Sequence, residues 1–219
     1  MNDKISTVLF DLDGTLINTE VIYQKYWKIA ADSLGYNLTA EDFLGFRSLG
    51  RTFAVPKMKE LTGVDTAYDD IRNCRKKMMD PIMKDMDIPL KPGVHEALIL
   101  LKDKGFRLGI ATATRLDRTY DYLERAGLRD YFDKVISARN VEKGKPAPDV
   151  YLYACREMGV EPGDAFAVED APNGVRSAAS AGCRVIMIPD LTEPDEELKK
   201  LLTFRADNLM AAAKYICGN

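Results

Sequence analysis

Thr7-Val8-Leu9-Phe10-Asp11-Leu12-Asp13-Gly14-Thr15 is the stretch of this sequence that decides the fold. A mainly apolar run, typical of a buried strand, ends there in two aspartates one residue apart, and a glycine follows them. A carboxylate at the end of a buried strand is costly unless a ligand or a counter-charge uses it. In open α/β folds, ligands bind at the carboxyl ends of the strands. Taken alone, the stretch more often marks a strand that runs into an acidic turn, so residues farther along the chain must decide.

Strand and helix patterns alternate along most of the chain. The predicted strands cover residues 7–10, 107–112, 134–137, 165–169 and 184–188. The predicted helices between them cover residues 94–104, 116–126, 148–158 and 173–181, and we expect Asn173 to cap the last of these. This alternation with short links indicates an α/β fold, in which a parallel sheet carries helices on both faces.

The segment from residue 17 to residue 89 contains no convincing strand. Apolar residues recur at helical spacing over 20–34, 40–43, 52–61 and 66–86, with Pro56 and Pro81 expected to start or kink a helix. An all-helical block inserted after the first strand would lie over the carboxyl edge of the sheet. We therefore expect a helical cap domain at residues 17–89 and an α/β core domain formed by residues 1–16 and 90–219.

Composition excludes several classes of function. The net charge of −3, without a strongly basic block, argues against nucleic acid as a partner. The four scattered cysteines fit neither a disulfide framework nor a zinc site, and a single histidine, His95, excludes histidine triads and multi-histidine metal sites. We see no signal peptide and no apolar run of the roughly 18 residues that a bilayer requires. We expect a cytoplasmic monomer that binds a small molecule and not a membrane.

Polar side chains close four of the predicted strands. They are Asp11 and Asp13, Thr112, Lys145 in the loop after the third strand, and the pair Glu169-Asp170. Because strand ends of one polarity share an edge in a parallel sheet, we expect these groups to converge. Carboxylates around Mg²⁺, with an ammonium and a hydroxyl for the phosphate oxygens, suit phosphoryl transfer. One aspartate could be a covalent nucleophile and the other an acid/base with a raised pKa.

These four features, in this order, resemble the motifs of the haloacid dehalogenase-like hydrolase superfamily. The helical block after the first motif resembles the first cap type of that family, so the resemblance covers nearly the whole chain. It implies a Rossmann-like sheet of five parallel strands in the order 5-4-1-2-3, flanked by helices. The strand that ends at Asp11 and the strand that ends at Glu169 would then lie side by side.

The resemblance also implies a role for each residue. Asp11 would be the nucleophile and a Mg²⁺ ligand, and Asp13 the acid/base whose backbone carbonyl also binds the metal. Thr112, Ala113 and Lys145 would hold the phosphoryl group, with Lys145 also neutralising Asp11.

Two further acids complete the implied metal site. Asp170 would bind Mg²⁺ itself, and Glu169 would assist directly or through water.

One residue in the cap narrows the chemistry. Family dehalogenases and phosphonate-cleaving members lack an aspartate at the position of Asp13, and its presence here argues against both activities. Sugar phosphomutases of the β-phosphoglucomutase type share all four motifs but carry a histidine ten residues after that acid, where this chain has Tyr23. We therefore expect a Mg²⁺-dependent phosphatase of small phosphorylated metabolites, such as sugar monophosphates, that forms an aspartyl-phosphate. The alternatives are a sugar phosphomutase of the β-phosphoglucomutase type and a non-catalytic protein of the same fold that binds a phosphorylated ligand or has a regulatory role.

Arginines of the cap are the remaining candidates. The segment Leu44-Gly45-Phe46-Arg47-Ser48 resembles the cap loop that selects substrates, which makes Arg47 and Arg51 candidates for contacting a phosphate or sugar hydroxyls. Exposed loop arginines are an equally good interpretation. The basic cluster at residues 72–77 favours a solvated helix face over substrate contact.

Overall fold

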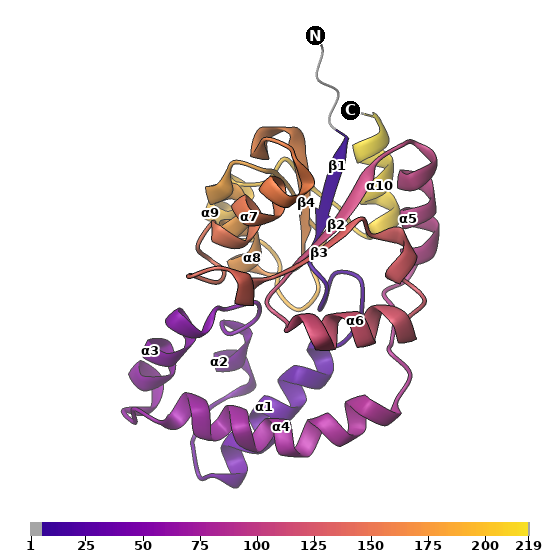
Figure 1. Cartoon of the computed structure of the whole chain (residues 1–219). Coiled ribbons are helices and arrows are strands. Elements are labelled where there is room, and N and C mark those ends of the chain that lie inside the picture. The colour runs from indigo at the N-terminus through magenta and orange to yellow at the C-terminus, as the bar shows by residue number, and fades with distance from the viewer. Residues whose placement is uncertain (1–5, 219) are drawn as a thin grey trace.

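A parallel sheet forms the centre of the computed structural model, which describes residues 6–218 (Figure 1). Its strands are β1 (Thr7–Phe10), β2 (Arg107–Thr112), β3 (Lys134–Ser137), β4 (Ala165–Glu169), β5 (Arg184–Met187) and β6 (Phe204–Arg205). They lie in the order β3-β2-β1-β4-β5-β6, and every neighbouring pair is parallel. Phe10 pairs with Ile110 on one side and Val168 on the other, so β1 is central and its carboxyl end lies beside those of β2 and β4.

Helices cover both faces of the sheet because successive side chains of a strand point to opposite faces. Val8 and Phe10 of β1 pack on the side of α5 (Val94–Asp103) and α10 (Leu209–Gly218). Leu9 packs on the other side, with α7 (Asp149–Met158), α8 (Pro172–Ala181) and α9 (Glu196–Lys199). The remaining elements are α6 (Leu116–Arg125) and the short 3-10 helices Arg129–Tyr131, Ala138–Asn140 and Pro162–Asp164. The sheet therefore has the two helical layers that the alternation of patterns predicts.

Four helices between β1 and α5 gather beyond the carboxyl ends of the strands (Figure 1). They are α1 (Glu20–Ser33), α2 (Ala40–Leu44), α3 (Arg51–Thr62) and α4 (Ala67–Asp85), and we call them the helical insert. Pro56 and Pro81 lie inside α3 and α4. The insert has its own aromatic cluster, in which the Trp27 ring centroid lies 5.7 Å from that of Phe43 and 5.7 Å from that of Tyr68. These contacts bury one side of α1 against α2 and α4.

The strand order agrees with the predicted order 5-4-1-2-3, and β6 extends the sheet beyond β5. Four of the five predicted strands have the observed bounds, and the fifth ends one residue earlier, at Met187. The patterns did not predict β6, α9 or α10, which the chain forms after β5. The division into domains at residues 17 and 89 stays a prediction.

None of the helices described over residues 6–218 combines the length and the apolar character needed to cross a membrane.

Candidate active site at the carboxyl edge of the sheet

The turn after β1 brings Asp11 beside the end of β4. The amide of Asp11 donates to the carbonyl of Val168 at 3.0 Å, and the Asp11 side chain is buried. Gly14 then takes a φ of 88°, and a Cβ at that position would overlap the Asp170 carboxylate. The glycine after the two aspartates is thus required both by backbone conformation and by the close approach of Asp170.

Lys145 connects the aspartate after β1 with the glutamate at the end of β4. Its ammonium donates to Asp11 Oδ1 and to Glu169 Oε1, each at 2.6 Å, and its side chain is fully buried. The Tyr151 hydroxyl, from α7, donates to the same oxygen of Glu169 at 2.5 Å. A buried ammonium between two carboxylates satisfies charges that would otherwise be costly away from water.

Three carboxylates are arranged so that they could hold a metal ion. Asp11, Glu169 and Asp170 each offer an oxygen within 4.8 Å of the others. Glu169 Oε2 is buried and has no hydrogen-bond partner among the described residues. Gly174 of α8 packs against that carboxylate so tightly that a Cβ would overlap it. Hard oxygen donors with a spare lone pair suit Mg²⁺, so the donor set fits the cation that the sequence predicts.

The protonation of these groups follows from burial. Burial raises the pKa of Glu169 to about 8, against the opposing effect of Lys145, and raises the pKa of Asp170 well above its ordinary value, against the opposing effect of Arg47. Burial disfavours charge on Lys145, but Asp11 and Glu169 outweigh it and raise the pKa of the ammonium. Lys145 therefore stays charged, whereas Glu169 and Asp170 need a further cation to ionise fully near neutral pH.

Asp13 lies apart from the three carboxylates and accepts two hydrogen bonds. The Thr19 hydroxyl donates to its Oδ1 at 2.6 Å, and the Thr114 hydroxyl donates to its Oδ2 at 2.7 Å. Burial raises the pKa of Asp13, the Thr19 bond lowers it, and the charge of Asp11 raises it further, with a net rise. A carboxyl group whose pKa is raised above its ordinary value suits an acid/base role.

Thr112 and Ala113 close β2 beside Asp11 and Asp13, and all four line one cavity. Thr112 is buried, and its hydroxyl accepts the backbone N–H of Thr114 at 3.0 Å. This turn points the Thr114 hydroxyl toward Asp13, so β2 positions both a predicted phosphate-binding hydroxyl and a partner of the second aspartate.

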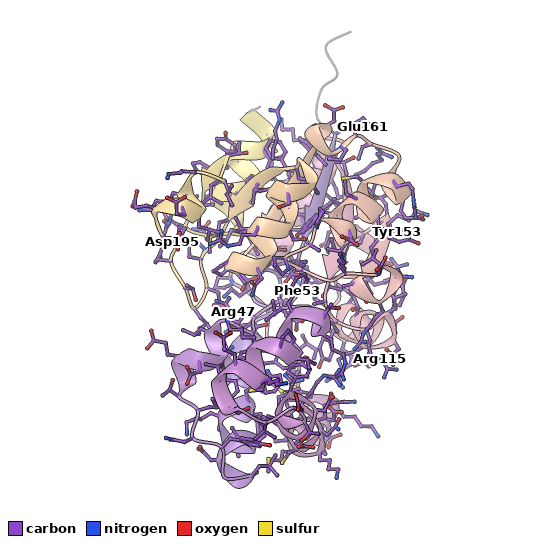
Figure 2. All side chains as sticks on the ribbon, turned by 90° about the vertical axis from the view of Figure 1, so that its left-hand side faces the viewer. Arg47, Phe53, Arg115, Tyr153, Glu161 and Asp195 are labelled. Atoms are coloured by element: carbon purple, nitrogen blue, oxygen red, sulfur yellow. The ribbon has the colours of Figure 1, made fainter. Side chains whose placement is uncertain are left out.

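Arg47 reaches from the helical insert into the acids of the site. It lies on the segment of residues 45–50 between α2 and α3, which we call the cap loop, at the junction of the insert with the rest of the molecule (Figure 2). Its buried guanidinium forms an ion pair with Asp170, and it also lies 3.7 Å from Glu20 and 3.6 Å from Asp190. Burial raises the pKa of Glu20 to about 8, with Arg47 acting in the opposite direction. Arg47 is therefore not an exposed loop arginine.

Two further contacts seat the cap loop on the core. The Gly50 amide donates to the carbonyl of Lys145 at 2.7 Å, and a Cβ on Gly50 would lie only 2.8 Å from the Cα of Gly144. The Asn173 side-chain amide donates to the carbonyls of Gly45 and Arg47 at 3.2 and 2.8 Å. The expectation that Asn173 caps α8 is wrong, because Ala171 holds the N-cap position and Asn173 binds the cap loop instead.

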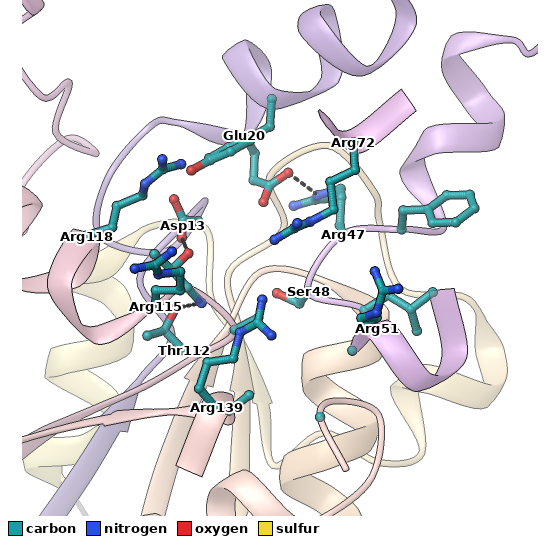
Figure 3. Close-up of a pocket in the computed structure, with 18 of the residues that line it drawn as sticks. Asp13, Glu20, Arg47, Ser48, Arg51, Arg72, Thr112, Arg115, Arg118 and Arg139 are labelled. Carbon is teal, nitrogen blue, oxygen red and sulfur yellow. Dashed lines mark hydrogen bonds and ion pairs between the residues drawn. The ribbon is translucent and has the colours of Figure 1, made fainter. Parts of the chain in front are cut away.

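A cavity of about 540 Å³, lined by Asp11 and Asp13, lies between the helical insert and the core (Figure 3). Arg51 lines it, but its exposed guanidinium is paired with Asp69, with one contact of 2.6 Å. Arg72, Arg75 and Lys76 of α4 also line the cavity, and Arg75 is buried. A solvated face is thus the wrong interpretation for Arg75, whereas Lys77 is exposed as expected.

Several residues of the site were not singled out by sequence reasoning. Asp190 follows β5 closely, so the strand-end rule that found Glu169 could have found it. Tyr151 lies inside α7, and Arg118 and Arg139 lie on segments whose sequence carries no motif. Both arginines line the cavity, and Arg139 follows β3 by two residues, so the strand-end rule could have found it as well.

Comparison with known proteins gives a consistent result. A family model described as haloacid dehalogenase-like hydrolase matches residues 8–188. A phosphorylated carbohydrates phosphatase of Thermotoga maritima is 31% identical over 180 residues, which are 81% of this chain and 82% of that protein. Hexitol phosphatase B of Escherichia coli is 29% identical over 190 residues, 85% of this chain and 84% of that protein. A crystal structure of CbbY from Rhodobacter sphaeroides in complex with phosphate shares 28% identity, with a TM-score of 0.73 over 94% of this chain and 95% of that chain.

Proposed function

The chain belongs to the haloacid dehalogenase-like hydrolase family, and on this basis we propose that it is a Mg²⁺-dependent phosphatase of small phosphorylated carbohydrates. The observation that carries the proposal is the bridge that Lys145 makes between Asp11 and Glu169, with a third carboxylate, Asp170, beside them. A nucleophilic carboxylate, a fixed positive charge and oxygen ligands for a cation are then gathered around one point. Phosphoryl transfer depends on this kind of positioning and charge compensation.

The first half-reaction forms a bond between a carboxylate oxygen of Asp11 and the phosphorus of the substrate. The bond from phosphorus to the ester oxygen breaks, and the leaving oxygen takes the proton of Asp13. The raised pKa of Asp13 supports this step, because it keeps a larger fraction of the carboxyl group protonated near neutral pH. Lys145 and Thr112 would hold the phosphoryl oxygens.

The second half-reaction releases the phosphate. Asp13, now ionised, takes a proton from water, and the water oxygen attacks the phosphorus of the aspartyl-phosphate. The bond to Asp11 breaks, which frees inorganic phosphate and restores both aspartates. Tyr23 lines the same cavity. Burial raises the pKa of its phenol well above the ordinary value, so Tyr23 stays neutral and takes no proton from water.

Mg²⁺ would be held by Asp11, Asp170 and the backbone carbonyl of Asp13, with Glu169 binding directly or through water. The ion would supply positive charge that permits the phosphate and the carboxylates to share the site.

The names of two relatives support a carbohydrate phosphate as the substrate. One is named a phosphatase of phosphorylated carbohydrates and the other a hexitol phosphatase. A cavity of about 540 Å³ with many polar side chains has the size and character for such a ligand.

Phosphate release from a panel of sugar and sugar-alcohol monophosphates, with MgCl₂ or with EDTA, tests the proposal. We expect turnover of some members with MgCl₂ and none with EDTA. Binding of sugar phosphates without release of phosphate in either buffer would favour a non-catalytic protein. An assay with β-glucose 1-phosphate and a bisphosphate activator distinguishes a phosphomutase from a phosphatase. Glucose 6-phosphate that appears faster than free phosphate would contradict the proposed hydrolysis.

We predict that Asp11→Asn abolishes phosphate release, because an amide is neither a nucleophile for phosphorus nor a partner for the Lys145 charge. Release should fall by about 10³-fold or more. Circular dichroism checks that the variant is folded. Release near the wild-type rate from the folded variant would exclude Asp11 as the nucleophile.

A further inference from the structure

Cationic side chains surround the cavity, and half of them are not neutralised by the protein. Eight line it, and four of these are paired with carboxylates: Arg47 with Asp170, Arg51 with Asp69, Arg115 with Asp117 and Arg118 with Asp80. The other four are Arg72, Arg75, Lys76 and Arg139. None of them has a hydrogen bond or ion pair to a carboxylate within residues 6–218. We call these four the unpaired cations.

Arg75 shows most clearly that a counter-charge is missing. Its guanidinium is buried between two rings, 4.9 Å from the centroid of Tyr23 and 4.4 Å from that of Trp27, and its Nε has no hydrogen-bond partner in the described part of the chain. Stacking on aromatic rings compensates only part of the cost of removing a charge from water. An anion that enters the cavity would supply the missing partner.

The unpaired cations come from both sides of the cavity. Arg72, Arg75 and Lys76 lie three and four residues apart on α4, and therefore share one face of that helix. Arg139 follows β3 on the core side. Figure 3 shows the side chains of Arg72 and Arg139 extending toward each other, with Asp13 and Thr112 to the left of their guanidinium groups. An anion held there would contact the insert and the core together.

We propose that the unpaired cations bind a second anionic group of the substrate, a phosphate or a carboxylate, while Asp11 attacks the first phosphate. The preferred substrates are then phosphorylated carbohydrates with an oxyanion at the end opposite the scissile ester. Arginine suits this task because its planar donors match both phosphate and carboxylate oxygens. This second anion site would define the substrate class of the proposed phosphatase, and the turnover measurements rest on that proposed function.

Matched substrates test the proposal by turnover. We compare a hexitol monophosphate, the bisphosphate of the same hexitol and the corresponding phosphorylated sugar acid with the wild-type protein and with the double variant Arg72→Gln/Arg139→Gln. Lys77→Gln is the control, because Lys77 is an exposed cation of α4 that does not line the cavity. We expect kcat/KM of the wild type to be about 10- to 100-fold higher for at least one doubly anionic substrate than for the monophosphate. The ratio should fall toward one in the double variant and stay at the wild-type value in the control.

A binding measurement keeps the proposal independent of turnover. With the Asp11→Asn variant in MgCl₂, calorimetry should give a Kd about 10-fold or more lower for a doubly anionic hexitol ligand than for the monophosphate, and the added Arg72→Gln/Arg139→Gln changes should remove that difference. A gain with the bisphosphate alone assigns the site to phosphate, and a gain with the acid alone assigns it to carboxylate. Equal Kd values for all three ligands would overturn the inference even if the monophosphate is hydrolysed. If the wild type hydrolyses no ester while the difference in Kd is present, the phosphatase function fails and the second anion site stands.

Discussion

Each carboxylate oxygen of Asp13 accepts one threonine hydroxyl, and the two threonines come from different segments. Thr19 precedes α1 of the helical insert, and Thr114 follows β2 of the core. Both bonds favour the ionised carboxylate and lower the pKa of Asp13, whereas burial raises it. The pKa of the proposed acid/base is therefore a balance that single hydroxyl groups can shift.

We predict that Thr114→Val moves the alkaline limb of the kcat/KM profile to higher pH. Loss of a donor to the charged form raises the pKa of Asp13, and the proposed first step needs this group protonated. A hydrogen bond worth about 1 kcal/mol corresponds to a shift of about 0.7 pH units. Rates across pH 5 to 9 with one monophosphate measure the shift.

Thr52→Val is the matched control, because Thr52 lines the same cavity, is exposed and makes no hydrogen bond that involves Asp13. An alkaline limb that stays in place in Thr114→Val, or that moves equally in both variants, would contradict the balance described for Asp13.

The sequence predicts individual core residues better than cap residues, for a physical reason. Asp11 and Glu169 end neighbouring parallel strands, and the geometry of a sheet then brings them to one edge whatever the loops do. Arg75 lies four residues after Ile71 and four before Met79, on the buried side of α4, so its spacing indicates burial but does not show that a cavity lies beside it. The proposed second anion site was invisible in the sequence for this reason.

At the scale of elements, the contact between β4 and α8 fixes the position of the Glu169 carboxylate. β4 ends in Glu169, and α8 begins three residues later with Gly174 packed on that carboxylate. Only a hydrogen fits there, so the first turn of the helix holds the Glu169 side chain in place.

We predict that Gly174→Ala lowers the free energy of unfolding by about 1–3 kcal/mol, because the added methyl group overlaps Glu169 and forces the helix or the carboxylate to move. The affinity for Mg²⁺ should weaken as well. Urea unfolding and calorimetric titration with MgCl₂ measure the two effects.

Gly163→Ala serves as the control, because a Cβ there meets nothing within 4 Å and its φ is not positive. It should change the free energy of unfolding by about 0.5 kcal/mol or less. An equal change in the free energy of unfolding for Gly174→Ala and Gly163→Ala would show that a methyl group at position 174 does not displace Glu169.

The last strand of the chain shows that short elements cannot be predicted from a periodic pattern. β6 has only two residues, Phe204 and Arg205, and exists because β5 offers an open edge beside it. Two residues carry no periodicity, so such a strand can be found only from its neighbour. The longer strands were predicted because their apolar runs are buried on both faces.

The whole molecule carries several buried acids whose pKa is raised, and its stability should reflect them. Burial raises the pKa of Glu20 and of Glu169 from 4.5 to about 8. Between these values the folded chain binds protons that the unfolded chain has released. The slope of unfolding free energy against pH is therefore negative there: the stability is complete below about pH 4.5 and is lost as the pH rises through about 8.

We predict that in EDTA the melting temperature falls between pH 5.5 and pH 8, by roughly 5 °C or more, and that MgCl₂ restores most of the loss. A cation bound to Glu169 and Asp170 favours their ionised forms, so its stabilising effect grows as protons leave. Thermal unfolding at both pH values, with and without MgCl₂, measures this. A melting temperature that is constant in EDTA, or a MgCl₂ effect as large at pH 5.5 as at pH 8, would contradict it.

The position of the helical insert on the core is the least predictable property at this scale. It depends on contacts between loops, such as the donation from Asn173 to the cap loop, and these have no signature in periodicity. The sequence therefore indicates that a cap exists over the strand ends, but not which of its residues reach the acids.

The crossing of Gly50 and Gly144 limits how freely caps can be exchanged between members of the family. A Cβ on either glycine would come within 2.9 Å of the Cα of the other, so the two main chains fit together only without side chains. A foreign insert spliced onto this core must bring a glycine to that crossing, or it will push away the segment that carries Lys145. The helices of the insert could therefore be exchanged more freely than the backbone around Gly50, which has to fit against Gly144.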